Sequence, residues 1–218
     1  MDPSTIIKHL FFLRAGITAG TGFTILWKGR TYMVSAKHIF EDERIDQFEM
    51  FHEGKWVDVP VRLERAPYKV DLVFGQMPLG IRAGYEIDLR ESGSSLSEDV
   101  FIFGFPLNLY QDFREANASD PVPFVAKACI AAIPGKGNPG EAGLFIAGQI
   151  DEGFSGGPIV LVRDNIPIVI GVFSSNLRKN VTERNARAEK LLIQHAANLA
   201  VGTSMSTVTA AIDSHFGE

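Results

Sequence analysis

The stretch Gly153-Phe154-Ser155-Gly156-Gly157-Pro158 sets a serine among glycines and stands directly before a β-type run. Glycine adopts positive φ angles readily, so this composition favours a tight turn. In such a turn the backbone N–H groups of Gly153 and Ser155 can point into one small space and hold an anionic oxygen. Glycine-rich turns that contain a serine are also common without such a role. Alone, the stretch leaves a serine nucleophile and a plain turn equally open.

A serine nucleophile needs a base within hydrogen-bond reach and an acceptor that orients the base. His38 ends the strand-like run 32–38, and Asp71 opens the apolar run 71–74. Taken singly, each has an ordinary structural interpretation, because an aspartate at a strand end often forms a turn and a histidine there is often solvated. The chain order histidine, aspartate, serine makes His38, Asp71 and Ser155 candidates for one catalytic site.

Short β-type runs bounded by turn residues fill most of the chain and predict an all-β protein. The predicted strands are 22–27, 30–36, 47–51, 56–63, 72–76, 100–105, 124–133, 144–147, 158–162 and 168–173. Apolar residues at helical spacing over 203–216 predict a C-terminal α-helix. The segment 177–190 carries five basic and two acidic residues and is predicted to be a mobile excursion or a short surface helix.

Taken together, these motifs resemble the chymotrypsin-like (trypsin-like) serine protease superfamily, and most of all its compact bacterial HtrA-type protease domains. Ser35-Ala36-Lys37-His38 stands where the family has Thr-Ala-Ala-His, and Asp71-Leu72-Val73 where it has Asp-Leu-Ala. Residues 153–158 stand where it has Gly-Asp/Asn-Ser-Gly-Gly-Pro, and Thr21-Gly22-Phe23 resembles its opening strand. The resemblance covers nearly the whole chain.

The resemblance implies a fold of two six-stranded antiparallel β-barrels with a C-terminal α-helix, in one peptidase domain over residues 1–218. The first barrel would cover about residues 10–90, the second 98–202, and the helix 203–216. His38 and Asp71 would come from the first barrel and Ser155 from the second.

The resemblance also implies a serine endopeptidase that hydrolyses peptide bonds through an acyl-enzyme intermediate. Ser155 would attack the peptide carbonyl while His38 takes its proton, and Asp71 would orient the imidazole. The N–H groups of Gly153 and Ser155 would form the oxyanion hole. The substrate would be a polypeptide, and the expected chemistry needs no cofactor and no metal.

Phe154 departs from the family pattern, because digestive members have aspartate there and HtrA-type members have asparagine. The aspartate-dependent zymogen switch therefore cannot operate, and the oxyanion loop must be ordered by other means. This leaves open a regulatory protein partner, or a substrate, that packs Phe154. It also keeps an alternative function open: a catalytically weak or inactive double-barrel module that binds peptides or partner proteins.

Five residues are predicted to contact the substrate. Alignment along the serine loop puts Gln149 and Ile150 near the base of the primary pocket, with Ser174 and Asn176 on its wall. Ser174, Ser175 and Asn176 resemble the edge segment on which a substrate strand pairs by β-addition. None of the five offers a buried carboxylate, so a small or uncharged side chain is expected before the cut.

The composition of the chain limits which kinds of partner it is expected to bind and where in the cell it is expected to be. With 21 basic and 26 acidic residues the net charge is −5, which lacks the basic excess that binding to nucleic acid requires. No apolar run approaches the roughly 18 residues that span a bilayer, so no membrane partner is expected. Cys129 is the single cysteine, so no disulfide can form within the chain, and a reducing, cytoplasmic location is expected.

Overall fold

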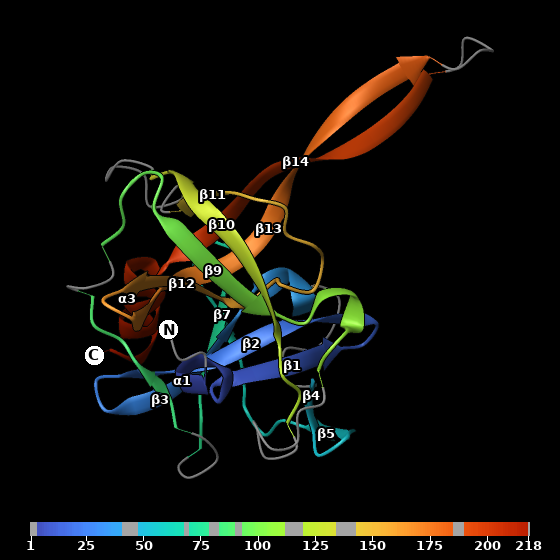
Figure 1. Ribbon diagram of the computed structural model, residues 1–218. Helices are drawn as coiled ribbons and strands as arrows, with labels where there is room; N and C mark the ends of the chain where they lie inside the picture. The colour runs from blue at the N-terminus through green and yellow to red at the C-terminus, as the bar shows by residue number, and fades with distance from the viewer. Residues whose placement is uncertain are drawn as a thin grey trace.

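The computed structural model in Figure 1 describes residues 4–40, 48–67, 70–78, 83–89, 93–111, 120–133, 143–184 and 190–217. Within these ranges, side chains are described everywhere except at 178–184 and 190–197. The chain forms two β-sheets, one after the other along the chain, and the C-terminal helix packs against both (Figure 1).

The first sheet contains eight strands in the order β5-β4-β1-β2-β3-β7-β6, with β8 added in parallel to β2. Its strands are β1 (Leu10–Ala15), β2 (Thr18–Trp27), β3 (Arg30–Ser35), β4 (Glu49–His52), β5 (Lys55–Asp58), β6 (Glu64–Arg65), β7 (Val73–Gln76) and β8 (Tyr85–Glu86). Lys28-Gly29 and Glu53-Gly54 join β2 to β3 and β4 to β5 with positive φ at both residues of each turn. Such turns match the twist of antiparallel strands, which is why these two hairpins form.

The expected closed first barrel is not observed within the described residues, where the sheet is open between β5 and β6. The predicted strand 56–63 is instead interrupted at Pro60, which has no N–H to give to a ladder. β6 is only two residues long, so it offers little register for closure. The sheet nevertheless curves around a core that includes Leu13, Phe40 and Val61.

The second sheet is a closed six-stranded barrel, as predicted, in the order β10-β11-β14-β13-β12-β9. Its strands are β9 (Asp99–Gly104), β10 (Phe124–Ala132), β11 (Gly143–Ala147), β12 (Pro158–Arg163), β13 (Ile166–Arg184) and β14 (Lys190–Ser204). The remaining elements are the helix α1 (Ser4–Ile7) and the single 3₁₀ turns η1 (Lys37–Phe40) and η2 (Pro106–Asn108).

The C-terminal helix α3 (Met205–Phe216) confirms the predicted helix and begins where Ser204 Oγ accepts a hydrogen bond from Thr207 N–H, at 3.3 Å. Val208 and Ile212 on its buried face share one apolar cluster with Phe23 from the first sheet and Val160 from the second. The two sheets and the helix therefore share a core, and this fixes how the sheets are placed relative to one another.

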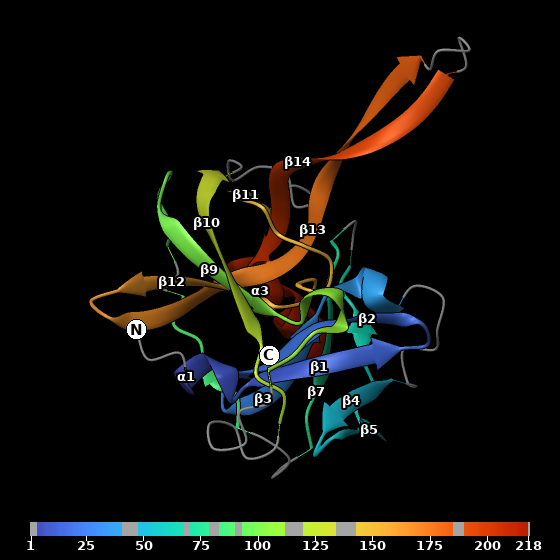
Figure 2. The same ribbon diagram turned by 45° about the vertical axis from the view of Figure 1, so that its right-hand side comes forward.

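The short surface helix that was one of two predictions for 177–190 is not observed; those of its residues that are described belong to β13 and β14. These two strands pair from Gly171↔Ser204 out to Arg184↔Lys190 and form a hairpin arm. In Figures 1 and 2 the arm stands clear of both sheets. The sequence did not reveal it because long charged runs are typical of solvated loops, whereas here backbone pairing makes the segment a strand.

No helix in the described part of the chain is both long enough and apolar enough to span a membrane.

Candidate active site

Strand pairing brings His38 and Asp71 together. His38 lies in η1 directly after β3, and Asp71 stands two residues before β7. β3 and β7 are antiparallel neighbours, so the end of β3 lies beside the start of β7, with Ser35 opposite Val73. Asp71 Oδ2 lies 2.7 Å from His38 Nδ1, and Asp71 Oδ1 accepts the His38 backbone N–H at 2.9 Å. Two bonds from one carboxylate hold both the backbone and the ring of His38.

The carboxyl group of Asp71 stays ionised because His38 stabilises its charge. Burial alone raises the pKa of Asp71, but the hydrogen bonds and the charge of His38 outweigh burial and hold that pKa below its ordinary value of 3.8. An ionised carboxylate only accepts hydrogen bonds, so His38 Nδ1 must be the donor in their contact. In neutral His38 the other ring nitrogen, Nε2, is then free of a proton and basic.

Ser155 sits in a turn that docks onto the first sheet. Its carbonyl accepts the Thr21 N–H at 2.8 Å. The next residue, Gly156, has φ +82°, and a Cβ there would lie 1.9 Å from the Thr21 carbonyl oxygen and 2.9 Å from Ala36 N. Glycine is therefore required at this position, because any side chain would push the serine turn away from the strand end that leads to His38.

The Ser155 hydroxyl donates its proton to the Ser174 carbonyl at 2.9 Å. A hydroxyl has a single proton to donate, so in this structure that proton is not shared with His38. The structure thus joins His38 to Asp71 and sets the serine turn against β2 and β3, while the serine-to-imidazole hydrogen bond expected from the sequence is not made.

The peptides on both sides of Gly153 are held by named partners. The Glu152 carbonyl accepts the Leu107 N–H at 3.1 Å, and the Gly153 carbonyl accepts the Thr21 hydroxyl at 2.8 Å. Because N–H and C=O point in opposite directions across a trans peptide, the Gly153 N–H faces away from Leu107. In the described part of the chain, neither the Gly153 N–H nor the Ser155 N–H has a hydrogen-bond acceptor. Both amides remain available to a bound oxygen.

Thr21 is a positioning residue that the sequence reasoning did not single out. Its side chain is fully buried and accepts the Phe105 N–H at 3.3 Å while donating to Gly153. A polar residue between two glycines in an apolar strand, Gly20-Thr21-Gly22, is the signal that could have indicated a buried hydrogen-bonding role.

Phe154 orders the serine turn from inside the second barrel. Its side chain is 4% exposed and packs in the same apolar cluster as Ile102 and Phe173. Gly104 permits this close approach, since a Cβ there would lie 2.7 Å from Phe154 Cα. Within the described chain, Phe154 is therefore packed by residues of the chain itself.

Replacing Phe154 by alanine is expected to lower the free energy of unfolding by about 3 to 5 kcal/mol, because a large buried ring leaves a cavity. Chemical denaturation measures this change. The variant should also lose order at Gly153 and Ser155, which proteolysis at the turn would detect. Ile168→Ala is the matched control, since Ile168 lies in the same cluster but outside the turn. Equal proteolysis of the turn in both variants would mean that Phe154 only fills the core.

The five residues that were predicted to contact the substrate differ in how exposed they are. Ser174 and Ile150 are buried, while Gln149 and Ser175 are exposed. The side-chain amide of Asn176 donates to the Ile150 carbonyl, so it ties the two predicted pocket segments together. One N–H of the Asn176 amide is therefore used within the protein.

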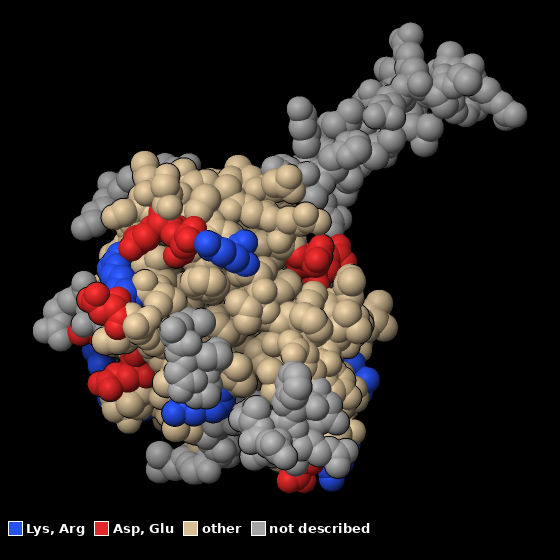
Figure 3. Space-filling model, in the orientation of Figure 1, with Lys and Arg blue, Asp and Glu red and all other residues tan. Residues whose placement is uncertain are grey.

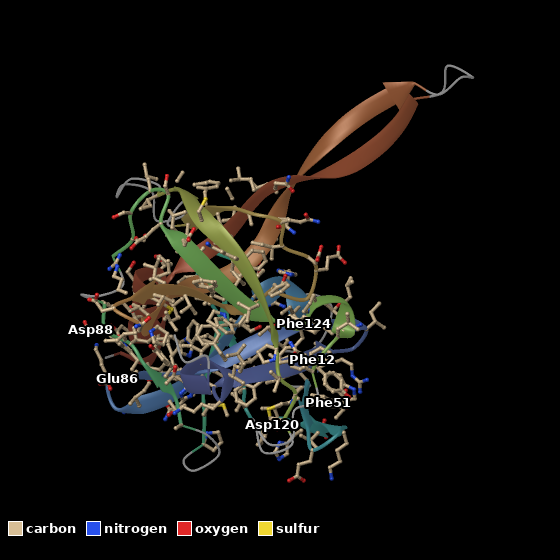
Figure 4. The ribbon with its side chains drawn as sticks, in the orientation of Figure 1. Phe12, Phe51, Glu86, Asp88, Asp120 and Phe124 are labelled. Carbon is tan, nitrogen blue, oxygen red and sulfur yellow. The ribbon has the colours of Figure 1, made fainter. Side chains whose placement is uncertain are left out.

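An aromatic cluster joins the first sheet to Phe105. Phe12 on β1 stacks on Phe105 with ring centroids 4.9 Å apart, and Phe51 and Trp56 pack against Phe12. Figure 4 labels Phe12 and Phe51, which lie near one another. The backbone N–H of Phe105 also donates to the Gly153 carbonyl oxygen, with 3.4 Å between nitrogen and oxygen. The cluster thus links the first sheet to the backbone beside the serine turn.

Charged side chains of both signs lie on the described surface. On the face shown in Figure 3, acidic and basic side chains are interspersed over a mostly uncharged surface. No group of three or more histidine, cysteine, aspartate or glutamate side chains in the described ranges is placed to hold a metal ion.

Comparison with known proteins shows the family and the fold of this chain. Residues 20–172 match the model of the trypsin-like peptidase domain, and this range contains His38, Asp71 and Ser155. None of the curated proteins compared with the chain is a significant match.

Solved structures share the fold at low identity. The Rv3671c protease of M. tuberculosis in its inactive form superposes with a TM-score of 0.61 at 14% identity, over 97% of this chain and 91% of that one. The serine endoprotease from Yersinia pestis gives a TM-score of 0.66 at 14% identity, over 97% of this chain and 64% of that one. The HtrA-type protease AlgW with a tripeptide gives 0.66 at 14%, over 97% and 61%. The match over residues 20–172 shows that the chain belongs to the trypsin-like peptidase family.

Proposed function

We propose that this protein is a serine endopeptidase with Ser155 as nucleophile, His38 as general base and Asp71 as the group that orients His38. The observation that carries the proposal is the double contact from Asp71 to His38, which leaves Nε2 as the basic nitrogen of the ring. A half-buried imidazole held in this orientation is what activation of a serine requires.

The reaction follows from these positions. Ser155 Oγ adds to the peptide carbonyl carbon as His38 Nε2 takes the hydroxyl proton, and His38 then gives that proton to the leaving amine. Water hydrolyses the resulting ester by the same two proton transfers. The N–H groups of Gly153 and Ser155 would bind the oxyanion, and each donor in such a hole contributes about 3 kcal/mol to the transition state.

For attack, the Ser155 hydroxyl must turn from the Ser174 carbonyl to His38. A substrate strand that pairs with the edge at Ser174–Asn176 brings backbone N–H groups that compete for the Ser174 carbonyl. Substrate binding would then release the Ser155 hydroxyl from Ser174, so that it can donate to His38. The same contact favours the second candidate, a peptide-binding module with little turnover, if the hydroxyl stays on Ser174.

Labelling with a fluorophosphonate separates the two candidates, because the reagent reacts only with an activated serine. We expect one phosphonyl group per chain, located on Ser155 by peptide mapping, and none on Ser155→Ala. Ser206→Ala is the matched control, since Ser206 is an exposed serine on α3. A folded wild-type protein that stays unlabelled even with substrate peptide present supports the binding module instead.

A further inference from the structure

A small cavity lies between β8 and the start of β13. It has a volume of about 60 Å³ and is lined by residues 85–88 on one side and by residues 166–169 on the other. One water molecule needs roughly 15 Å³ of such space, so the cavity has room for a few waters or for the end of one extended side chain. Val169 and Ser174 stand five residues apart on β13, about 17 Å at roughly 3.3 Å per residue, so the cavity is separate from the reaction site.

Both walls of the cavity are strand edges. β8 pairs with β2 on one side, and no strand in the described part of the chain pairs with its other side. β13 pairs with β12 from Ile166 onward, whereas its pairing with β14 begins only at Gly171. The cavity therefore lies where two open strand edges meet, one from each sheet.

The pairing of β12 with β13 turns the backbone of Val169 toward this open edge. The two-residue turn 164–165 has positive φ at both residues, so the residues that flank it form a hydrogen-bonded pair. Bonded and non-bonded pairs alternate along an antiparallel ladder, so Pro167 and Val169 direct their backbone groups away from β12. The Pro167 carbonyl accepts the Tyr85 hydroxyl across the cavity.

The Val169 carbonyl is the acceptor that remains. Val169 is 3% exposed, and none of the backbone hydrogen bonds of the described chain reaches its carbonyl. A buried carbonyl without a donor is costly, so an occupant of the cavity that brings N–H groups is favoured.

The lining of the cavity combines negative charge with apolar surface. Glu86 and Asp88 both line it, and none of the eight described residues around it is basic. Figure 4 labels these two residues, which lie near one another at the left-hand edge of the view. Ile166 is 59% exposed at the same cavity, and Ile87 is buried there. Such a lining suits a ligand with an alkyl stem and a cationic end.

A lysine side chain has this chemistry. Its four-carbon stem can pack against Ile87 and Ile166, as lysine stems do on apolar surface. Its ammonium group has three donors and no acceptor, which matches the two carboxylates and the Val169 carbonyl. The flat guanidinium of arginine is less well suited, because its five donors need acceptors arranged around one plane.

We propose that this cavity binds the side chain of a lysine that a partner protein presents on an exposed turn or extended segment. The net charge of −5 steers a basic partner toward the chain. A lysine within a protein is favoured over the free amino acid, because the α-carboxylate of free lysine would be repelled by Glu86 and Asp88. None of these residues belongs to the candidate active site, so the proposal stands independently of the proposed function.

Nuclear magnetic resonance titration of the ¹⁵N-labelled full chain tests the proposal. The protein carries Ser155→Ala, which prevents self-digestion during the measurement. The probe is Nα-acetyl-lysine methylamide, which mimics a lysine within a chain, and the matched control is its uncharged Nε-acetyl derivative. We expect the amide signals of Glu86, Ile87 and Val169 to shift and saturate with the charged probe. The uncharged derivative and free lysine should bind at least fivefold more weakly.

A charge variant with unchanged side-chain shape provides the second measurement. Glu86→Gln should weaken binding of the charged probe at least fivefold at low salt and much less at high salt, because salt screens exposed charges. Asp58→Asn is the matched control, since it removes one negative charge at an exposed position on β5 that does not line the cavity. It should bind the probe as the parent protein does, and thermal unfolding should show both variants folded.

Each outcome decides the question. Equal binding of the charged and uncharged probes overturns the proposal, as does unchanged binding by Glu86→Gln or saturable shifts confined to other parts of the chain. Tighter binding of free lysine than of the blocked probe assigns the cavity to the amino acid and not to a partner protein. A dimer in sedimentation that becomes monomeric in Glu86→Gln assigns it to a lysine of a second copy of the chain.

Discussion

Replacing Ser155 by alanine is expected to lower kcat for peptide hydrolysis by about 10⁶-fold, as removal of the nucleophile does in serine proteases generally. The alanine has no oxygen to form the acyl-enzyme, so only transition-state binding by the free amides of Gly153 and Ser155 remains. Steady-state cleavage of a fluorogenic peptide measures the change, with protein concentration set by absorbance because active-site titration fails for this variant.

Two further variants make this prediction specific. His38→Ala should lose nearly as much activity, and the double variant S155A/H38A should lose no more than S155A alone, because the two groups act as a unit. Ser206→Ala on α3 should keep full activity. Retention of more than about 1% of wild-type kcat by purified Ser155→Ala contradicts the assigned nucleophile.

Replacing Asp71 by asparagine is expected to lower kcat by about 10⁴-fold while the structure around the site persists. The carboxylate accepts two bonds from His38, at 2.7 and 2.9 Å. An asparagine amide group that keeps the backbone bond through its oxygen presents its NH₂ to Nδ1, which moves the imidazole proton to Nε2. That nitrogen can then no longer take the serine proton. An Asp71→Asn enzyme with more than a tenth of wild-type kcat contradicts this role.

The same variant has a signature in the pH dependence of stability. The pKa of Asp71 in the folded protein lies below its ordinary value of 3.8. A lowered folded pKa contributes stability above the unfolded pKa, which lies near that ordinary value, and this contribution disappears as pH falls through the folded value. Between pH 5 and 2 the unfolding free energy of wild type should therefore fall more steeply than that of Asp71→Asn. Asp58→Asn, at an exposed site, should follow wild type.

Much of the fold could be predicted because it depends on local patterns. Glycine turns at Gly29 and Gly54 and alternating apolar runs define most strands, and the spacing of Val208 and Ile212 predicts α3. The prediction of a closed first barrel was not confirmed within the described residues, because closure depends on pairing between distant edges that Pro60 and the two-residue β6 do not supply.

The candidate site, too, could be predicted from the sequence only in part. The residue types and their order indicated His38, Asp71 and Ser155, and the structure shows the contact between the first two. The orientation of the Ser155 hydroxyl could not be predicted, since it depends on where β13 places the Ser174 carbonyl. Phe154 departs from the family pattern, but only its position in the barrel core shows that it is packed.

What the sequence by itself determined is the chemistry the chain carries: a serine among glycines, a histidine and an aspartate at strand ends, and the family to which these motifs point. Those features are local, because a few neighbouring residues set turn and strand preferences. Only the tertiary structure decided that the Asp71 carboxylate bonds to the His38 ring and that the Thr21 hydroxyl donates to the Gly153 carbonyl across the two sheets. It also decided that β13 continues past Ser174 into the hairpin arm. Each of these depends on contacts between residues far apart in the chain, which form only when both sheets are packed on their shared core.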